Sequence, residues 1–144
     1  MDIFQIKELF DQKDVPSVRA GQVNAIVTCF NEALRLPYFL KFYERLGIDR
    51  MLVIDNGSTD GSGKILDACP IVTRLSTTKA FKDHKTIWRE ALANQFFAHR
   101  WVIFPDIDEL FVYPGWPDRD IKWFIRYLET PGYDAVFASM VDMY

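Results

Sequence analysis

Short apolar runs separated by amphipathic segments make up most of the chain. The first run, 23–30 (VNAIVTCF), is compact and rich in β-branched residues, which is typical of a parallel strand covered on both faces. Runs of the same kind predict further strands over 51–54, 71–75 and 101–104. Two weaker strand candidates lie at 110–113 and 133–138.

The segments between these runs have the spacing of helices. An apolar face predicts a helix from about Leu36 to Gly47, with Pro37 in its first turn and Asn31 available as its cap. Further helices are predicted over 64–68, 81–99 and 118–129. The last of these has Asp118 as its expected N-cap.

Strands that alternate with helices predict an α/β fold with a mostly parallel sheet and right-handed crossovers. In such sheets, ligands collect beyond the carboxyl ends of the strands. Polar clusters follow the four strongest predicted strands, at 28–32, 55–60, 76–85 and 106–109. We therefore expect all four clusters to open onto one edge of the sheet.

The beginning of the chain has a different pattern, so we expect residues 1–22 to form an N-terminal helix and linker, and 23–144 to form one α/β domain. Four apolar residues have helical spacing, namely Ile3, Ile6, Leu9 and Phe10. They predict a short amphipathic helix that covers the core. The alternative is a helix that docks on a partner or a membrane.

The strongest chemical signal is the acidic segment after the fourth predicted strand. Asp106 and Asp108 are separated by one residue on an extended segment, so they point to the same side and can bind a hard divalent cation. Asp118 and Asp120 have the same spacing but open a predicted helix, where carboxylates favour the positive end of the helix dipole. Position therefore favours a metal or nucleotide contact for the first pair and a structural role for the second.

Two other clusters supply candidate contacts. Asp55 ends an apolar strand, where a carboxylate without a partner is costly, and this favours a ligand contact. In the small-residue loop that follows it, Asp60 is better explained as a helix cap. Lys82, Lys85 and Arg89 share one face of the longest predicted helix. Such a face is usually solvated, but an arginine is also suited to bidentate contact with phosphate.

Composition narrows the class of protein. The chain has 144 residues, 49% of them hydrophobic, which is enough for one packed domain. A net charge of −3 and a pI of about 5.3 argue against a generic nucleic-acid binder. Cys29 and Cys69 make neither a disulfide framework nor a zinc site. Because no secretory signal or bilayer-spanning run is visible, we expect a cytoplasmic protein.

Taken in order, these motifs resemble those of glycosyltransferases with the GT-A fold, in particular the family 2-like group. The resemblance covers about 23–111, and it is carried by TCFNE at 28–32, LGID at 46–49, IDNGSTDGS at 54–62, WREAL at 88–92 and DIDELF at 106–111. It implies a Rossmann-like, mostly parallel sheet flanked by helices. It also implies transfer of a sugar from a nucleoside diphosphate sugar, commonly a UDP sugar, to a carbohydrate or lipid-linked acceptor.

The resemblance implies a role for each matched residue. The implied nucleotide-binding residues are Thr28, Asn31, Glu32, Asp55, Asn56, Arg89 and Asp106. Asp55 would contact the base or ribose, and Arg89 the base or diphosphate. Asp106 and Asp108 would hold Mn²⁺ or Mg²⁺, which stabilises the departing nucleoside diphosphate. Glu109 would stand beside Asp108 in the catalytic centre as a supporting carboxylate.

The sequence departs from that family in its second half. Family members usually continue into an acceptor-binding half that supplies a catalytic base, whereas this sequence ends at Tyr144 without a convincing base after Asp108. The alternative function is therefore a non-catalytic or partner-dependent nucleotide-sugar-binding module. An exposed edge in such a donor half would favour self-association, and peripheral membrane association is a further expectation.

Motif positions exclude several other classes that bind nucleotides or phosphate. A dinucleotide oxidoreductase would have a glycine fingerprint after the first strand, where TCFNE stands instead, and no Walker phosphate loop occurs. A sugar nucleotidyltransferase would have a glycine-rich basic first loop. A haloacid-dehalogenase-type phosphatase would have its paired aspartates after the first strand rather than the fourth.

Overall fold

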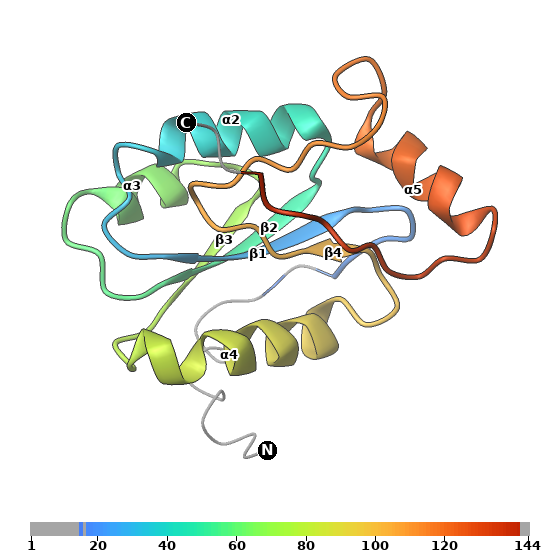
Figure 1. Ribbon diagram of the computed structural model, residues 1–144. Coiled ribbons are helices and arrows are strands. Elements are labelled where there is room, and N and C mark those ends of the chain that lie inside the picture. Colours follow the sequence, from blue (N-terminus) through green and yellow to red (C-terminus); the bar gives the residue numbers. More distant parts are fainter. Residues whose placement is uncertain (1–14, 16, 142–144) are drawn as a thin grey trace.

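In a computed structural model, which describes residues 15 and 17–141, a parallel sheet lies between two layers of helices (Figure 1). The elements in chain order are β1 (Asn24–Cys29), α2 (Leu36–Leu46), β2 (Arg50–Asp55), α3 (Ser62–Asp67), β3 (Val72–Ser76), α4 (Phe81–Phe96), β4 (Val102–Ile103) and α5 (Ile121–Glu129). Within the described residues the strand order is β3-β2-β1-β4, and every pair is parallel. The predicted α/β class is therefore confirmed.

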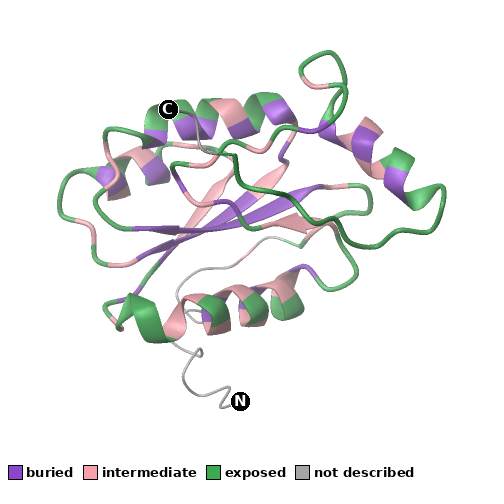
Figure 2. Cartoon of the chain, viewed as in Figure 1, coloured by how far each residue is buried: buried purple, intermediate pink, exposed green. Residues whose placement is uncertain are grey.

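The centre of the sheet is formed by β1 and β2. They pair over six positions, from Asn24 beside Arg50 to Cys29 beside Asp55. All six residues of β1 are buried, as expected for a strand covered on both faces (Figure 2). The short strand β4 pairs only with the first two residues of β1, so that Asn24 lies beside Val102.

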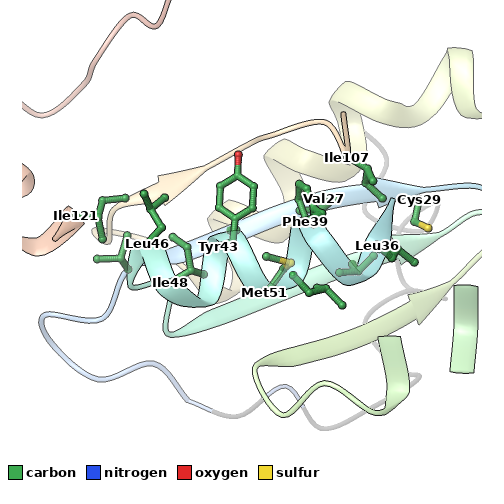
Figure 3. Packing of buried hydrophobic residues seen from close by; sticks show 14 of the residues in the cluster. Val27, Cys29, Leu36, Phe39, Tyr43, Leu46, Ile48, Met51, Ile107 and Ile121 are labelled. Atoms are coloured by element: carbon green, nitrogen blue, oxygen red, sulfur yellow. The ribbon is translucent and has the colours of Figure 1, made fainter. Parts of the chain in front are cut away.

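The helices α2, α3 and α5 cover one face of the sheet. Figure 3 shows the side chains of Phe39, Tyr43 and Leu46 from α2 packed toward Val27 of β1 and Met51 of β2. Full burial of one such side chain stabilises the fold by about 1.5–3 kcal/mol. The same cluster contains residues of α5 and of the segment after β4, so this layer also fixes the acidic loop described below.

The opposite face is covered by α4. Trp88 and Leu92 of this helix are fully buried against Ile26, Leu52 and Ile54 of the central strands. These residues form an apolar cluster separate from the one under α2. The two clusters lie on opposite sides of the sheet, as the two helix layers of Figure 1 indicate.

Helix ends follow the expected chemistry, with three corrections. The N-cap of α3 is Gly61 and not Asp60. Gly47 ends α2 in the left-handed region, at φ 101°, and its N–H donates to Glu44 O. Asn31 does not cap this helix, because its side chain is bound elsewhere. The cap of α5 is Asp120, which accepts from Trp123 N at 2.7 Å, and not Asp118.

Other boundaries differ from the sequence predictions. α4 ends at Phe96 rather than at residue 99, and α3 begins at Ser62 rather than at residue 64. The predicted strands at 110–113 and 133–138 are wrong, because both segments run without pairing to the sheet. The predicted helix within residues 1–14 lies outside the described residues.

Residue 15 and residues 17–141 contain no helix that combines the length and the apolar character needed to cross a membrane.

Candidate functional site

A cavity of about 380 Å³ lies at the carboxyl ends of the strands. It is lined by Thr28, Cys29, Phe30, Glu32, Asn56, Phe81, Lys85, Asp106, Ile107 and Asp108. These residues come from all four polar clusters singled out in the sequence. The expectation that the clusters open onto one edge of the sheet is therefore confirmed.

The acidic loop after β4 is built as a turn, so the predicted extended segment at Asp106 to Asp108 is wrong. Glu109 N donates to Asp106 O at 3.0 Å, and Asp106 N donates to the Glu109 carboxylate at 3.1 Å. Ile107, between the two aspartates, is buried in the core. The turn thus anchors its apolar residue inward and leaves Asp106 and Asp108 at the cavity.

Tyr43 of α2 attaches this loop to the rest of the fold. Its hydroxyl donates to Glu109 O at 3.0 Å and accepts from Phe111 N at 3.2 Å. Figure 3 shows the ring of Tyr43 standing on α2 with its hydroxyl directed away from the helix. Burial raises the pKa of this phenol to about 12, so it stays protonated and able to donate.

Asp106 is held by two cations of α4. Lys85 Nζ donates to its carboxylate at 2.8 Å, and Arg89 Nη2 donates at 2.5 Å. Partial burial favours the neutral acid and raises the pKa of Asp106, but the hydrogen bonds and charges of Lys85 and Arg89 outweigh it and lower that pKa below its ordinary value. Asp106 is therefore an ionised carboxylate with both cations attached.

Asp108 has a different environment. Its side chain is exposed at the cavity, and among the described residues no donor hydrogen-bonds to it or forms an ion pair with it. The negative charge of Asp108 acts on the Arg35 guanidinium only at longer range. Asp108 is thus the carboxylate of the pair that is available to a ligand.

The serine-rich loop after β2 binds the loop after β1 through four hydrogen bonds. Ser58 Oγ, Ser62 Oγ and an Asp60 carboxylate oxygen accept, each at 2.9 Å, from the main-chain amides of Asn31, Glu32 and residue 33, respectively. In return Asn31 Oδ1 accepts from the amide of residue 59 at 2.8 Å. The loop therefore fixes the position of Glu32 at the cavity. Asp60 also accepts from Ser62 N at 3.0 Å, so it has a structural role in the loop, but it is not the predicted helix cap, because the N-cap of α3 is Gly61.

Asp55 is buried beside the cavity rather than in it. One oxygen accepts from Ser58 N at 3.0 Å, and the other accepts from Arg74 Nη1 at 3.1 Å. The cost of burying this carboxylate, which favoured a ligand contact in the sequence, is thus offset inside the protein. Sequence reasoning missed Arg74 because its pairing depends on the register between β2 and β3.

The structure divides the predicted site residues into two groups. Those that line the cavity are Thr28, Glu32, Asn56, Asp106 and Asp108. Those that do not line it are Asn31, Asp55, Arg89 and Glu109, and each has a hydrogen-bond partner within the protein. In this structure the second group supports the first.

Several lining residues were not predicted. Lys85 belonged to the basic face recognised in the sequence, but Phe30, Phe81 and Ile107 carried no polar signal. Cys29 also lines the cavity, and burial raises the pKa of its thiol to about 11. This thiol is therefore protonated at neutral pH and is no nucleophile.

One side chain at this cavity, Asp108, is suited to hold a divalent cation. Among the described residues, no three acidic, histidine or cysteine side chains come together as a metal site. Mg²⁺ and Mn²⁺, however, are often held by one or two carboxylates, with waters and substrate phosphates completing the shell. Asp108 meets that requirement as it stands, whereas Asp106 would first have to leave Lys85.

A second cavity, of about 400 Å³, lies at the opposite end of the sheet, where Trp101 precedes β4. It opens between Trp101, Glu129 and Tyr133, and Trp101 Nε1 donates to Glu129 across it at 2.8 Å. None of the predicted site residues lines it. The first cavity is therefore the better candidate although it is slightly smaller.

No protein-family model matches the chain, and no curated protein matches it either. Functional conclusions for this chain consequently rest on its motifs and on the geometry of the cavity.

Proposed function

We propose that this chain binds a nucleoside diphosphate sugar in the cavity at the carboxyl ends of the strands and takes part in transfer of the sugar, as the donor-binding part of a GT-A glycosyltransferase of the family 2-like group. One observation carries the proposal. Three segments that are distant in sequence bring Thr28, Glu32, Asn56, Asp106 and Asp108 to a single cavity, and α4 adds Lys85. Its volume lies within the range of about 300–1,000 Å³ that small-molecule sites occupy.

In this proposal the chain's own residues have distinct tasks. Thr28 and Asn56 offer neutral polar groups to the nucleoside, and the Asn56 amide is held in place because it donates to Thr77 O and Lys79 O, at 3.1 and 2.9 Å. Lys85 offers a cation to the diphosphate. Asp108 would hold Mn²⁺ or Mg²⁺, and such an ion supplies charge neutralisation to the departing diphosphate.

Titration calorimetry tests the donor site. We expect at least one of UDP, GDP and CDP to bind, and to bind more tightly with Mn²⁺ than without it. Asp108→Asn should weaken the Mn²⁺-dependent binding by about tenfold or more, since it removes the exposed carboxylate. The matched control is Asp118→Asn, because Asp118 has the same spacing to a second aspartate but lies outside the cavity.

Two results would contradict the donor site: no nucleoside diphosphate binds, or Asp108→Asn binds like the wild type. A hydrolysis assay on the corresponding nucleoside diphosphate sugars then separates the two functions. Slow release of free sugar supports an enzyme. Binding without any turnover supports the alternative, a nucleotide-sugar-binding module.

A further inference from the structure

The ion pair between Lys85 and Asp106 lies in the wall of the cavity. Both side chains line it, and both are partly exposed, Lys85 at 27% and Asp106 at 37%. Arg89 is the third member of the cluster but does not line the cavity, and its side chain is only 17% exposed. The cluster therefore has an accessible side, which is the pair, and a buried side, which is the arginine.

The two contacts of Asp106 differ in how readily a ligand could replace them. Ion pairs between partly exposed side chains contribute about 0–1 kcal/mol, so an incoming anion can compete for Lys85 at little cost. Arg89 has a second acceptor, Pro105 O at 3.4 Å, and lies behind the carboxylate. Lys85 is also placed over the ring of Phe81, at 5.4 Å from its centroid, which favours an ammonium that stays at the wall.

We propose that, in the unliganded cavity, the carboxylate of Asp106 occupies the place beside the Lys85 ammonium that the anionic group of a ligand would take. A phosphate oxygen then binds by taking the ammonium of Lys85 from Asp106, while Arg89 keeps the released carboxylate at the wall. Lys85 is thus the residue that contacts the anion, and Arg89 is a positioning residue for Asp106. The inference rests on the proposed function only in naming the anion as a diphosphate.

The proposal gives Asp106 a role opposite to that of a ligand-binding carboxylate. If Asp106 held the ligand, its loss would weaken binding. If it competes with the ligand for Lys85, its loss strengthens the binding of an anion, provided that no divalent cation is present. The sign of the effect therefore decides between the two roles.

The test measures the affinity of inorganic pyrophosphate and of UDP by calorimetry in the presence of EDTA. We expect Asp106→Asn to bind both ligands about two- to fivefold more tightly than the wild type, because a competing charge is removed. Lys85→Met should weaken both by a similar factor. In the double variant the gain from Asp106→Asn should disappear, since the gain acts through Lys85.

The control is Lys82→Met, on the same helix but outside the cavity, which should leave both affinities unchanged. Circular dichroism of each variant establishes that it is folded. If Asp106→Asn does not fold, the comparison of Lys85→Met with Lys82→Met decides, and equal affinities would overturn the proposal.

The possible failures are distinguishable. Weaker or unchanged binding in a folded Asp106→Asn overturns the inference, and the donor site then still stands if UDP binds with Mn²⁺. Tighter binding of pyrophosphate to Asp106→Asn supports the inference, and the proposed function is contradicted separately if UDP, GDP and CDP all fail to bind in the presence of Mn²⁺. If neither ligand binds to any variant in EDTA, the inference is wrong, and nucleotide binding in the presence of Mn²⁺ then decides the proposed function.

Discussion

Three carboxylates at this edge of the sheet differ in exposure, and their roles follow from it. The side chain of Asp55 is 4% exposed and is paired with Arg74, so it belongs to the scaffold. Asp106 is intermediate in exposure and is paired with two cations. Asp108 is exposed and has no such partner among the described residues. The sequence made all three candidates for a ligand contact, with Asp106 and Asp108 as the metal candidates, and their partners in the structure separate them.

The ion pairs of Asp106 predict a specific dependence of stability on pH. The pKa of the folded-state carboxyl lies below its ordinary value of 3.8, so the ionised form is favoured by folding. The stabilisation is therefore fully present above about pH 4 and is lost as pH falls through the folded-state pKa. We expect Asp106→Asn to lower the free energy of unfolding by about 1 kcal/mol at pH 7, and this difference to shrink as the pH falls below about 4.

Urea unfolding followed by tryptophan fluorescence at pH 7, 5, 4 and 3 measures that difference. Asp118→Asn serves as the control, because Asp118 is exposed and forms no ion pair among the described residues. A difference between wild type and Asp106→Asn that stays constant from pH 7 to pH 3 would show that the ion pairs do not form in solution.

At the scale of elements, one loop of the site supports another. The loop after β2 resembles a phosphate-binding loop in composition, yet its hydroxyls and carboxylates bind main-chain amides of the loop after β1. Those amides are consequently occupied and do not face a ligand. Asn56, at the start of this loop, lines the cavity itself, whereas the serine-rich part supports the proposed site indirectly, through the position of Glu32 and of the turn before α2.

A substitution of Ser62 tests whether the loop after β2 supports the loop after β1. It is fully buried, and its hydroxyl accepts from Glu32 N at 2.9 Å and donates to Asp60 at 2.6 Å. Ser62→Ala leaves the partly buried amide of Glu32 without its partner, so we expect the free energy of unfolding to fall by about 1–2 kcal/mol. Hydrogen exchange at the Glu32 amide should become faster.

The matched control is Thr59→Ala in the same loop. Residue 59 contributes its main-chain amide, and its side chain is exposed, so the stability should change by less than about 0.5 kcal/mol. Equal effects of the two substitutions, or an unchanged exchange rate at Glu32, would mean that the loops are held together by other contacts.

At the scale of the whole molecule, the sequence predicts the helix and strand layers correctly but predicts two strands that the sheet does not contain. Apolar runs and helical spacing are properties of one segment, so β1 to β3 and α2 to α4 could be recognised from their own residues. The wrong strands at 110–113 and 133–138 have suitable composition, but a strand also needs a neighbour to pair with, and local patterns carry no information about neighbours. A residue's place at the end of a strand shows which edge of the sheet it reaches, and this correctly located the cavity. It does not show which cation lies beside the residue, and the ligand contact predicted for Asp55 therefore missed its pairing with Arg74.

The two helix layers imply that the apolar clusters on the two faces of the sheet act independently. Ile26 belongs to the cluster under α4 and Ile48 to the cluster under α2, and both are buried. Each Ile→Val substitution removes one methylene and should cost about 0.5–1.5 kcal/mol. Because the sheet separates the two sites, the double variant should lose the sum of the single losses within about 0.5 kcal/mol, measured by urea unfolding. A larger coupling would mean that strain passes through the central strands. The loop after β1 at the cavity would then respond to packing on both faces.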